Sequence, residues 1–267
     1  MDAQQMRELA TRWLNGEIGD QQYFREYAAS ATQYALDATL DLDRQRRCGF
    51  PEVVFAEGKS SAQLVSIMGK LVESSGAAFA TRVSANQAAE LSLAFKSVRY
   101  NEIARTAVID ESPASAPMIG HVVVVTAGTS DLPVAEEAME TLAWMSVHSH
   151  LIQDVGVAGP HRLVMRASEL QAADAVIVVA GMEGALPSVV GGYVDCPVIG
   201  VPASTGYGAN LNGMAALLSM LNSCASNVAV VNVDSGFKGA YIAGMMARRC
   251  QAHATAADGN EGEINER

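Results

Sequence analysis

From residue 121 onward, short runs of β-branched apolar residues alternate with longer segments of helical spacing. Runs without polar alternation, such as HVVVVTA and DAVIVVAGM, are typical of parallel strands that are covered on both faces. The alternation of strands with helices predicts a doubly wound α/β sheet with right-handed crossovers. The predicted strands are 121–127, 150–159, 174–182, 196–204 and 227–234, and the predicted helices are 130–149, 160–171, 184–194, 210–224 and 238–251.

The N-terminal part of the chain has a different pattern, which predicts a smaller α/β domain. Two short amphipathic helices are separated by Asn15-Gly16, and strands and helices then follow at shorter spacing. The polar segment 110–120 has the composition of a linker, and the polar end has that of a disordered tail. We therefore expect N-terminal helices in 1–30, a small α/β domain in 31–115, a larger α/β domain in 116–254 and a disordered tail in 255–267.

The charge of the chain narrows the class of partner. The 267 residues carry a formal net charge of -11, which argues against sequence-independent binding of nucleic acid. A basic run, Arg44, Arg46 and Arg47, is short and flanked by acidic residues, so it suits one small anion and not a duplex. No apolar run is long enough to span a membrane, and the polar N-terminus is unlike a signal peptide. We expect a cytoplasmic protein with neither nucleic acid nor membrane as partner.

Ligands of such sheets bind at the carboxyl ends of the strands, so the residues that follow each strand are candidates for the site. After the first strand, Gly128, Thr129, Ser130 and Asp131 offer backbone N–H groups and hydroxyls to an anion. The same residues also suit a plain helix cap, in which Ser130 or Asp131 binds backbone N–H groups.

After the second and third strands come a basic pair and an acid. His161 can exchange a proton near neutral pH, and Arg162 can bind a phosphate or carboxylate with two N–H groups; both residues also suit a surface helix turn. Glu183 lies among glycines and apolar residues that would solvate its charge poorly, which suits a proton-transferring carboxyl. Its alternative role is to complement a helix dipole.

After the fourth strand, the segment VPASTGYGANLNG is rich in small residues and hydroxyls, with glycines that let a ligand approach the backbone. This composition is more typical of a ligand cradle than of a flexible loop. The last predicted strand is likewise followed by small and polar residues, in the segment DSGFKGA. Candidate ligand-binding residues in these segments are Gly181, Met182, Pro202, Ser204, Thr205, Tyr207, Asn210, Asp234, Gly236 and Phe237.

Cys224 has two interpretations. A cysteine outside a disulfide is more often a small buried apolar residue than a nucleophile. The neighbours of Cys224 are polar, however, whereas a packing site would be expected to have apolar neighbours. If the preceding helix ended in the cleft, Cys224 and Glu183 could meet over one ligand.

These segments resemble the LarB family, whose members begin the synthesis of the nickel-pincer nucleotide cofactor. The resemblance covers about residues 30–250 and rests on VVVVTAGTSDLPVAEEA, DVGVAGPHRL, VIVVAGMEGALPSVVGGYVDCPVIGVPAS, GYGANLNGMAALLSMLNSCA and VVNVDSGFKGA, with DLDRQRRCGFPEVVFAEGK upstream. The C-terminal half also resembles aminoimidazole-ribonucleotide carboxylase through GTSD, HR, ALP and CPVIGVP. The resemblance implies a flavodoxin-like doubly wound sheet.

The resemblance also implies a reaction. Nicotinic acid adenine dinucleotide is carboxylated at C5 of its pyridinium ring by CO2 or bicarbonate-derived CO2, and its phosphoanhydride is hydrolysed. The products are AMP and pyridinium-3,5-biscarboxylic acid mononucleotide, and Mg²⁺ is the expected cofactor. By resemblance Cys224 is the nucleophile, while Glu183 is our candidate for the base. Lys59 and Arg82 in the first domain are candidates to close over the nucleotide.

Two other functions stay open at this point. A carboxylase or mutase of purine synthesis has a His-Leu-Pro segment where this chain has Ala185-Leu186-Pro187. A nucleotide sensor with the same cleft would need no reactive cysteine or glutamate. Carboxylases of this fold assemble as octamers, so the resemblance implies a homo-oligomer. The Met-rich last helix is a candidate subunit contact, and ordinary core packing is its alternative role.

Overall fold

The computed structural model describes residues 3–35, 38–111 and 117–264, which divide into two compact units. The first unit contains residues up to 101 together with 106–113, and the second contains 102–105 and the chain from 114 onward. The helices within residues 3–31 belong to the first unit.

A parallel five-stranded sheet forms the centre of the second unit. Its order is β11-β10-β9-β7-β8, which is the 2-1-3-4-5 order of flavodoxin-like folds and confirms the predicted fold class. All four neighbouring pairs are parallel. The strands are β7 (Ile119–Thr126), β8 (Val147–Ile152), β9 (Ala175–Ala180), β10 (Val198–Pro202) and β11 (Val228–Val230).

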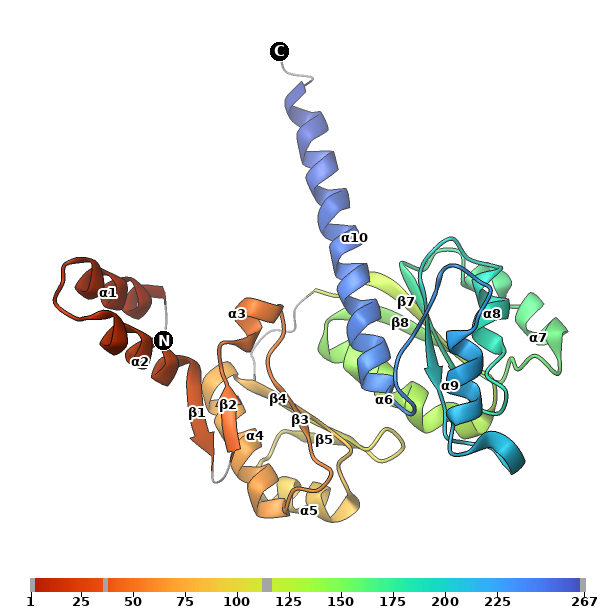
Figure 1. Ribbon diagram of the computed structural model, residues 1–267, viewed down its shortest axis with the longest axis horizontal. Coiled ribbons are helices and arrows are strands. Elements are labelled where there is room, and N and C mark those ends of the chain that lie inside the picture. Colours follow the sequence, from red (N-terminus) through yellow and green to blue (C-terminus); the bar gives the residue numbers. More distant parts are fainter. Residues whose placement is uncertain (1–2, 36–37, 112–116, 265–267) are drawn as a thin grey trace. The chain divides into compact units, whose positions relative to one another are not determined.

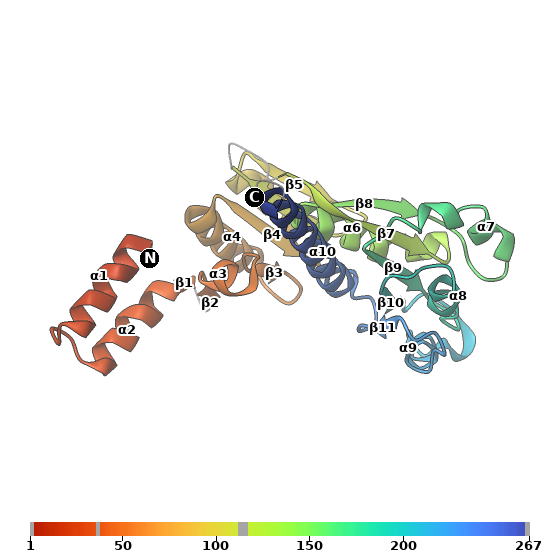
Figure 2. The ribbon, with the colours of Figure 1, turned by 90° about the horizontal axis from the view of Figure 1, so that it is seen from above.

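Helices cover both faces of this sheet, as Figures 1 and 2 show. The first face packs against α6 (Leu132–Trp144) and α10 (Gly236–Ile264), and the second against α8 (Leu186–Gly191) and α9 (Met214–Leu221). Every residue of β9 is buried, as expected for a central strand covered on both faces. Shorter helices follow other strands: η1 (Thr129–Asp131), α7 (Pro160–Val164), η2 (Ala167–Glu169) and η3 (Gly208–Asn210).

The predicted helix over 130–149 is too long, because α6 ends at Trp144 and β8 begins at Val147. Between them Ser146 adopts a left-handed conformation with φ 57°, which ends the helix. The segment from Val147 then pairs with β7. Sheet pairing thus outweighs the helical spacing of this segment.

The C-terminal end also differs from the expectation. The composition predicted a disordered tail in 255–267, whereas α10 continues through this segment to Ile264. Residues 265–267 lie outside the described residues. Several alanines follow Cys250, and alanine extends an existing helix without the cost of starting a new one.

The first unit contains a four-stranded sheet of order β3-β4-β6-β5, in which only β3 and β4 are parallel. Its core lies between this sheet and two helices. These elements confirm the small α/β domain. Their bounds are β3 (Val53–Phe55), α4 (Ser61–Ser75), β4 (Ala77–Thr81), α5 (Ala85–Ala94), β5 (Val98–Asn101) and β6 (Thr106–Asp110).

The N-terminal helices α1 (Ala3–Leu14) and α2 (Asp20–Ala31) are separated at the predicted Asn15-Gly16 position, where Gly16 has φ 75°. Three elements were not predicted: the antiparallel strands β1 (Thr32–Ala35) and β2 (Ala38–Asp41), and the short helix α3 (Arg44–Cys48). Strands of four residues leave little alternation to recognise.

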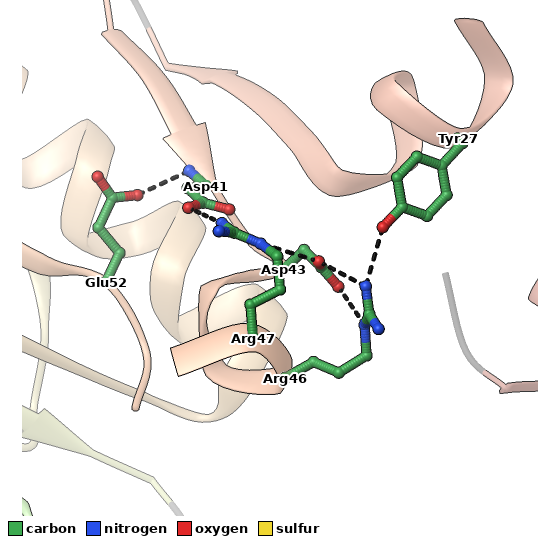
Figure 3. Close-up of polar contacts among 6 residues, drawn as sticks. All are labelled: Tyr27, Asp41, Asp43, Arg46, Arg47 and Glu52. Atoms are coloured by element: carbon green, nitrogen blue, oxygen red, sulfur yellow. Dashed lines mark hydrogen bonds and ion pairs between the residues drawn. The ribbon is translucent and has the colours of Figure 1, made fainter. Parts of the chain in front are cut away.

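The basic run of α3 is already paired with acids. Arg46 donates hydrogen bonds to Asp43, with Nε at 2.7 Å from Oδ1, and to the Tyr27 hydroxyl at 2.9 Å. Arg47 pairs with Asp41 and with Asp43 (Figure 3). The structure therefore shows these two arginines fastening α3 to β2 and α2, which fits a structural role better than the anion site considered from the sequence.

Candidate active site

A pocket of about 410 Å³ lies in the second unit, at the carboxyl edge of the five-stranded sheet. Its walls are the segments that follow β7, β8, β9 and β10. Strand order reverses between β7 and β9, so the pocket lies at the place where sheets of this type bind ligands. The candidate residues that line the pocket are Gly128, Ser130, Asp131, Arg162, Gly181, Met182, Glu183, Thr205 and Tyr207.

Asp131 is the most buried acid of the pocket, and it is 4% exposed. Its carboxylate accepts hydrogen bonds from the Gly128 N–H at 2.8 Å and from the Thr205 hydroxyl at 2.9 Å. Loss of hydration on burial raises the pKa of Asp131, and the hydrogen bonds from Gly128 and Thr205 oppose part of this rise. The Gly-Thr-Ser-Asp segment therefore has two roles. Asp131 caps the Gly128 N–H, as we considered from the sequence, and the segment also forms a wall of the pocket.

Gly181 lets the loop after β10 cross the end of β9. A Cβ on Gly181 would clash with the Thr205 carbonyl oxygen and lie 2.7 Å from the Thr205 hydroxyl oxygen. The Met182 N–H donates to the same carbonyl at 3.3 Å. Gly181 is therefore required by a close approach of two backbone segments, and the pocket depends on it.

Glu183 lines the pocket and is exposed to solvent. This corrects the expectation that its surroundings would solvate it poorly. It lies on a tight turn in which Met182 and Gly184 both have positive φ, at 50° and 64°. The turn ends where α8 begins, and it holds the carboxylate at the mouth of the pocket, within reach of a ligand and of water.

Arg162 lines the pocket from α7 and is held by a residue that the sequence did not single out. Its Nη1 lies 2.9 Å from Oδ2 of Asp154, and Asp154 has a left-handed φ of 56°. A Cβ on Gly159 would lie 2.7 Å from Nε of Arg162. His161 is exposed and is not among the lining residues. Asp154 fell inside the strand that we predicted over 150–159, so no strand-end pattern pointed to it.

The loop after β10 is fixed from outside the pocket. The Ser204 N–H donates to Oδ1 of Asp234 at 2.7 Å, and the side-chain amide of Asn210 donates to the Ser204 carbonyl at 2.9 Å. These residues thus hold the loop rather than line the pocket. Tyr207 is 81% exposed at the pocket edge. The other candidates outside the pocket lining are Thr129, Pro202, Gly236 and Phe237.

Gly236 and Phe237 begin α10, where the backbone meets α6 closely. The Phe237 N–H donates to the Glu137 carboxylate at 3.1 Å, and a Cβ on Gly236 would clash with the Val134 carbonyl. Glu137 is buried and was not a sequence candidate. This second strand-end segment therefore fixes the start of α10 on α6.

Cys224 does not meet Glu183 in the way that we considered. It is exposed, it is not among the residues that line the pocket, and it precedes the amino end of β11. Next to it, the Ser223 hydroxyl lies 2.8 Å from the Ser188 hydroxyl of α8. The helix before Cys224 therefore ends away from the pocket, and the residues of one chain do not bring the thiol and the pocket carboxylate together.

Two family models match the chain in sequence order. Residues 32–111 match the LarB/PurE-like N-terminal domain, and residues 121–260 match AIR carboxylase. This is the domain pair expected from the resemblance. The chain belongs to the LarB family. The two matched ranges fall on the first and second units of the structure.

Relatives of this LarB-family chain include proteins of Methanocaldococcus jannaschii and Methanobrevibacter smithii. An uncharacterized protein of Methanocaldococcus jannaschii is 39% identical over 251 residues, covering 91% of this chain and 97% of the relative. A probable N5-carboxyaminoimidazole ribonucleotide mutase of Methanobrevibacter smithii is 31% identical over 133 residues, covering 47% of this chain and 37% of the relative.

Solved structures similar to the LarB-family chain include two from Treponema denticola. A PurE2 variant is 20% identical with a TM-score of 0.39, and the match covers 56% of this chain and 100% of that structure. PurE is also 20% identical, with a TM-score of 0.38, and the match covers 55% and 99%.

Lys59 and Arg82 lie at neighbouring strand ends of the LarB/PurE-like domain. Lys59 follows β3 and Arg82 follows β4, and these two strands are parallel neighbours. The Lys59 ammonium donates to the Phe55 carbonyl at 2.7 Å, while Arg82 has a left-handed φ of 57°. The two cations thus share one edge of the sheet in their own unit.

Within residues 3–35, 38–111 and 117–264, no group of three or more His, Cys, Asp or Glu side chains is placed to hold a metal ion. In the same part of the chain, no helix combines the length and the apolar character that crossing a membrane requires.

Proposed function

We propose that this LarB-family chain carboxylates the pyridinium ring of nicotinic acid adenine dinucleotide and hydrolyses its phosphoanhydride. The matches to the LarB/PurE-like and AIR carboxylase models support an enzyme of the carboxylase or mutase kind. One observation favours the pyridinium substrate. The described residues that line the pocket include Glu183 and Ala185 but no histidine, so our candidate for the general base is the Glu183 carboxylate and not an imidazole.

The ring needs a nucleophile before it can react with CO2. A pyridinium ring is electron-poor, but addition of a thiolate at C4 turns it into a dihydropyridine with enamine character. Its C5 then donates an electron pair to CO2 and forms the new C–C bond. A base removes the C5 proton, the C4–S bond breaks, and the ring regains its aromaticity as the thiolate leaves. Water cleaves the phosphoanhydride and gives AMP.

The pocket residues suit these steps. Glu183, at the mouth, is our candidate for the base that takes the C5 proton. Arg162 would exchange its bond with Asp154 for one with a substrate phosphate or carboxylate. Tyr207 offers an exposed ring for contact with the cationic pyridinium. By resemblance, Lys59 and Arg82 stay candidates for nucleotide binding on the first unit, and Cys224 stays the candidate for the thiolate.

Mg²⁺ would be carried by the diphosphate of the substrate. The protein fits this role only loosely, because both Asp131 oxygens already accept hydrogen bonds and Glu183 is the other pocket carboxylate. A Mg²⁺ ion commonly uses one or two carboxylates, with water and phosphate oxygens as its other ligands. When bound, it would neutralise charge on the phosphoanhydride.

The test is product analysis by mass spectrometry with nicotinic acid adenine dinucleotide, bicarbonate and Mg²⁺. We expect AMP and the dicarboxylated mononucleotide from the native chain and from Cys250→Ala, which replaces another exposed cysteine. We expect neither from Cys224→Ala. Equal product from Cys224→Ala would remove Cys224 from the mechanism, and unchanged dinucleotide with all variants would contradict the function.

A second candidate function is the conversion of N5-carboxyaminoimidazole ribonucleotide. The match of residues 121–260 to AIR carboxylase favours it, as does the relative named as a probable mutase. Turnover of that nucleotide by the native chain, with none of the dinucleotide, would establish it.

A nucleotide sensor would bind the dinucleotide unchanged, and Cys224→Ala would leave both binding and function intact.

A further inference from the structure

We propose that His121, His148 and His150 form a binding site for a divalent transition-metal ion such as Zn²⁺. The three residues belong to β7 and β8, which are neighbouring strands of the second unit. None of them is among the residues that line the pocket, so this site is independent of the proposed function.

The pairing of β7 with β8 gathers three of the five histidines of the chain. The two strands are parallel, and His121 is the register partner of His148. His150 follows His148 by two residues, and side chains two apart on a strand project from the same face of the sheet. Register partners on neighbouring parallel strands also share a face. The three imidazoles therefore start from one patch of the sheet.

Two of these imidazoles already stand at nearly the spacing that a metal ion requires. Nε2 of His121 lies 3.0 Å from Nδ1 of His150, and the two ring planes are 19° apart. Two nitrogens bound to one tetrahedral Zn²⁺ ion stand about 3.4 Å apart. A small rotation and separation of the rings would therefore let the ion replace the hydrogen bond between them.

The second nitrogen of each ring faces a group that fits a metal-bound imidazole. Nδ1 of His121 donates to the Ala172 carbonyl at 3.2 Å, which leaves the lone pair of this neutral ring on Nε2. His150 must then use its own proton on Nδ1 to bond with His121. Its buried Nε2 is left as an acceptor, without a hydrogen-bond partner among the described residues. The nearest carboxylate oxygen, on Glu169, is 3.7 Å away and is also an acceptor.

Binding of a metal ion would satisfy this acceptor. With the ion on Nδ1 of His150, the ring carries its proton on Nε2, where the Glu169 carboxylate accepts it. Histidines that bind metals almost always donate their other N–H to a carboxylate or a carbonyl, and these two histidines have one of each. A carboxylate can accept several hydrogen bonds, so Glu169 can keep the bond of 2.8 Å from Arg166.

His148 would supply the third ligand. Within residues 3–35, 38–111 and 117–264, no three His, Cys, Asp or Glu side chains stand ready around a metal position, so the site has to be completed by a rotation. His148 is exposed, and its side chain can therefore turn without displacing packed groups. Water would fill the remaining position, as in other sites with three protein ligands.

The surroundings also set the class of ion. The Asp174 carboxylate accepts the His121 N–H at 2.7 Å, and Glu169 lies on the other side of the pair, while Arg166 offsets one of these two negative charges. The remaining negative charge favours a cation. Imidazole nitrogens suit Zn²⁺ and similar transition metals, whereas Mg²⁺ takes oxygen ligands.

Zinc binding by histidine variants tests the site. The background chain carries Cys224→Ala and Cys250→Ala, because exposed thiols also bind Zn²⁺. Isothermal titration calorimetry is expected to show a single Zn²⁺ per chain. Each ligand substitution should raise the Kd about tenfold or more: His121→Gln, His148→Gln and His150→Gln. A Kd that any one of these three leaves unchanged would overturn the three-histidine site.

Two further variants separate the loss of a ligand from a general disturbance of the fold. Glu169→Gln keeps the size of the side chain but accepts the His150 proton less strongly, so the Kd should rise about tenfold. His161→Gln replaces an exposed histidine outside the cluster and should bind Zn²⁺ as the background chain does. An equally large loss of affinity in His161→Gln would contradict the assignment of the ion to the three histidines.

X-ray absorption at the zinc edge identifies the ligands without changing any histidine. In the background chain loaded with one equivalent of Zn²⁺, we expect imidazole nitrogens at about 2.0 Å. Sulfur ligands at about 2.3 Å would show that cysteines hold the ion and would overturn the proposal. Neither measurement reads conversion of the dinucleotide, so failure of the proposed function would leave the result for this site unchanged.

Discussion

The Asp131 carboxylate accepts a hydrogen bond of 2.9 Å from the Thr205 hydroxyl, and this bond ties the loop after β7 to the loop after β10. Between these two strands lies β9, whose end is occupied by Gly181. The pocket is thus spanned by a partly buried hydrogen bond that passes over a residue without a side chain. The shape of the pocket therefore depends on this hydrogen bond and on the absence of a side chain at Gly181. The two can be tested separately.

The buried Asp131 carboxyl predicts that the stability of the fold depends on pH. Because the folded state raises the pKa of Asp131 above its ordinary value of 3.8, the folded chain binds the proton more tightly than the unfolded chain. The contribution of this group to the free energy of unfolding therefore falls as the pH rises from about 3.8 through the folded pKa. Asp131→Asn should remove this fall. Urea unfolding at several pH values measures it, and a constant difference between native and variant would contradict it.

The close approach of the Thr205 backbone to Gly181 predicts that Gly181→Ala destabilises the chain and distorts the pocket. The added Cβ meets the backbone of Thr205, and overpacking of this kind costs about 1–3 kcal/mol. Gly192→Ala is the matched control, because its added Cβ would meet its first neighbour at 3.4 Å, an ordinary contact. Thermal unfolding of the two variants compares them. Equal melting temperatures would show that the Gly181 contact relaxes at no cost.

Arg162 should act in substrate binding through its charge. Arg162→Ala is expected to raise the KM for the dinucleotide roughly tenfold or more, because a hydrogen bond to a charged group is worth about 1.5–3 kcal/mol. Arg166→Ala is the control: this arginine pairs with Glu169 and does not line the pocket. Steady-state kinetics of both variants tests this. A similar rise in KM for both variants would mean that the substitutions disturb the fold of this segment rather than remove a contact with the substrate.

A second titrating group lies outside the pocket. His150 stacks on His121, and its Nδ1 is 3.0 Å from Nε2 of His121. Burial lowers the pKa of His150, as do the nearby His121 and Arg166, while Glu169 opposes them. The unfolded chain thus takes the proton more readily, and stability should fall as the pH is lowered from about 6.5 through the folded pKa. His150→Gln should weaken this fall. If stability depends on pH in the same way in the native chain and in His150→Gln, the fall is not due to His150.

Much of the second unit was predictable because buried parallel strands have an unmistakable pattern. Runs of valine and isoleucine located β7, β9 and β10, and the rule of carboxyl ends then located the pocket. Helix ends were less predictable. The end of α6 depends on a left-handed Ser146, a conformation that serine seldom adopts and that no local pattern indicated.

The candidate site could be predicted only in part, because a sequence shows which residues follow a strand but not which of them face the pocket. Ser204, Asn210 and Asp234 fix a loop, and Asp154 orients Arg162 through a contact that spacing did not reveal. The position of Cys224 depends on the direction of α9, which needs the three-dimensional structure.

The most direct test of the account is the stoichiometry of the reaction with ¹³C-labelled bicarbonate. We expect each AMP released from nicotinic acid adenine dinucleotide to be matched by one dicarboxylated mononucleotide that carries one labelled carbon. Loss of the label from the product, or AMP formed without any carboxylated mononucleotide, would contradict carboxylation of the ring as the function of this chain.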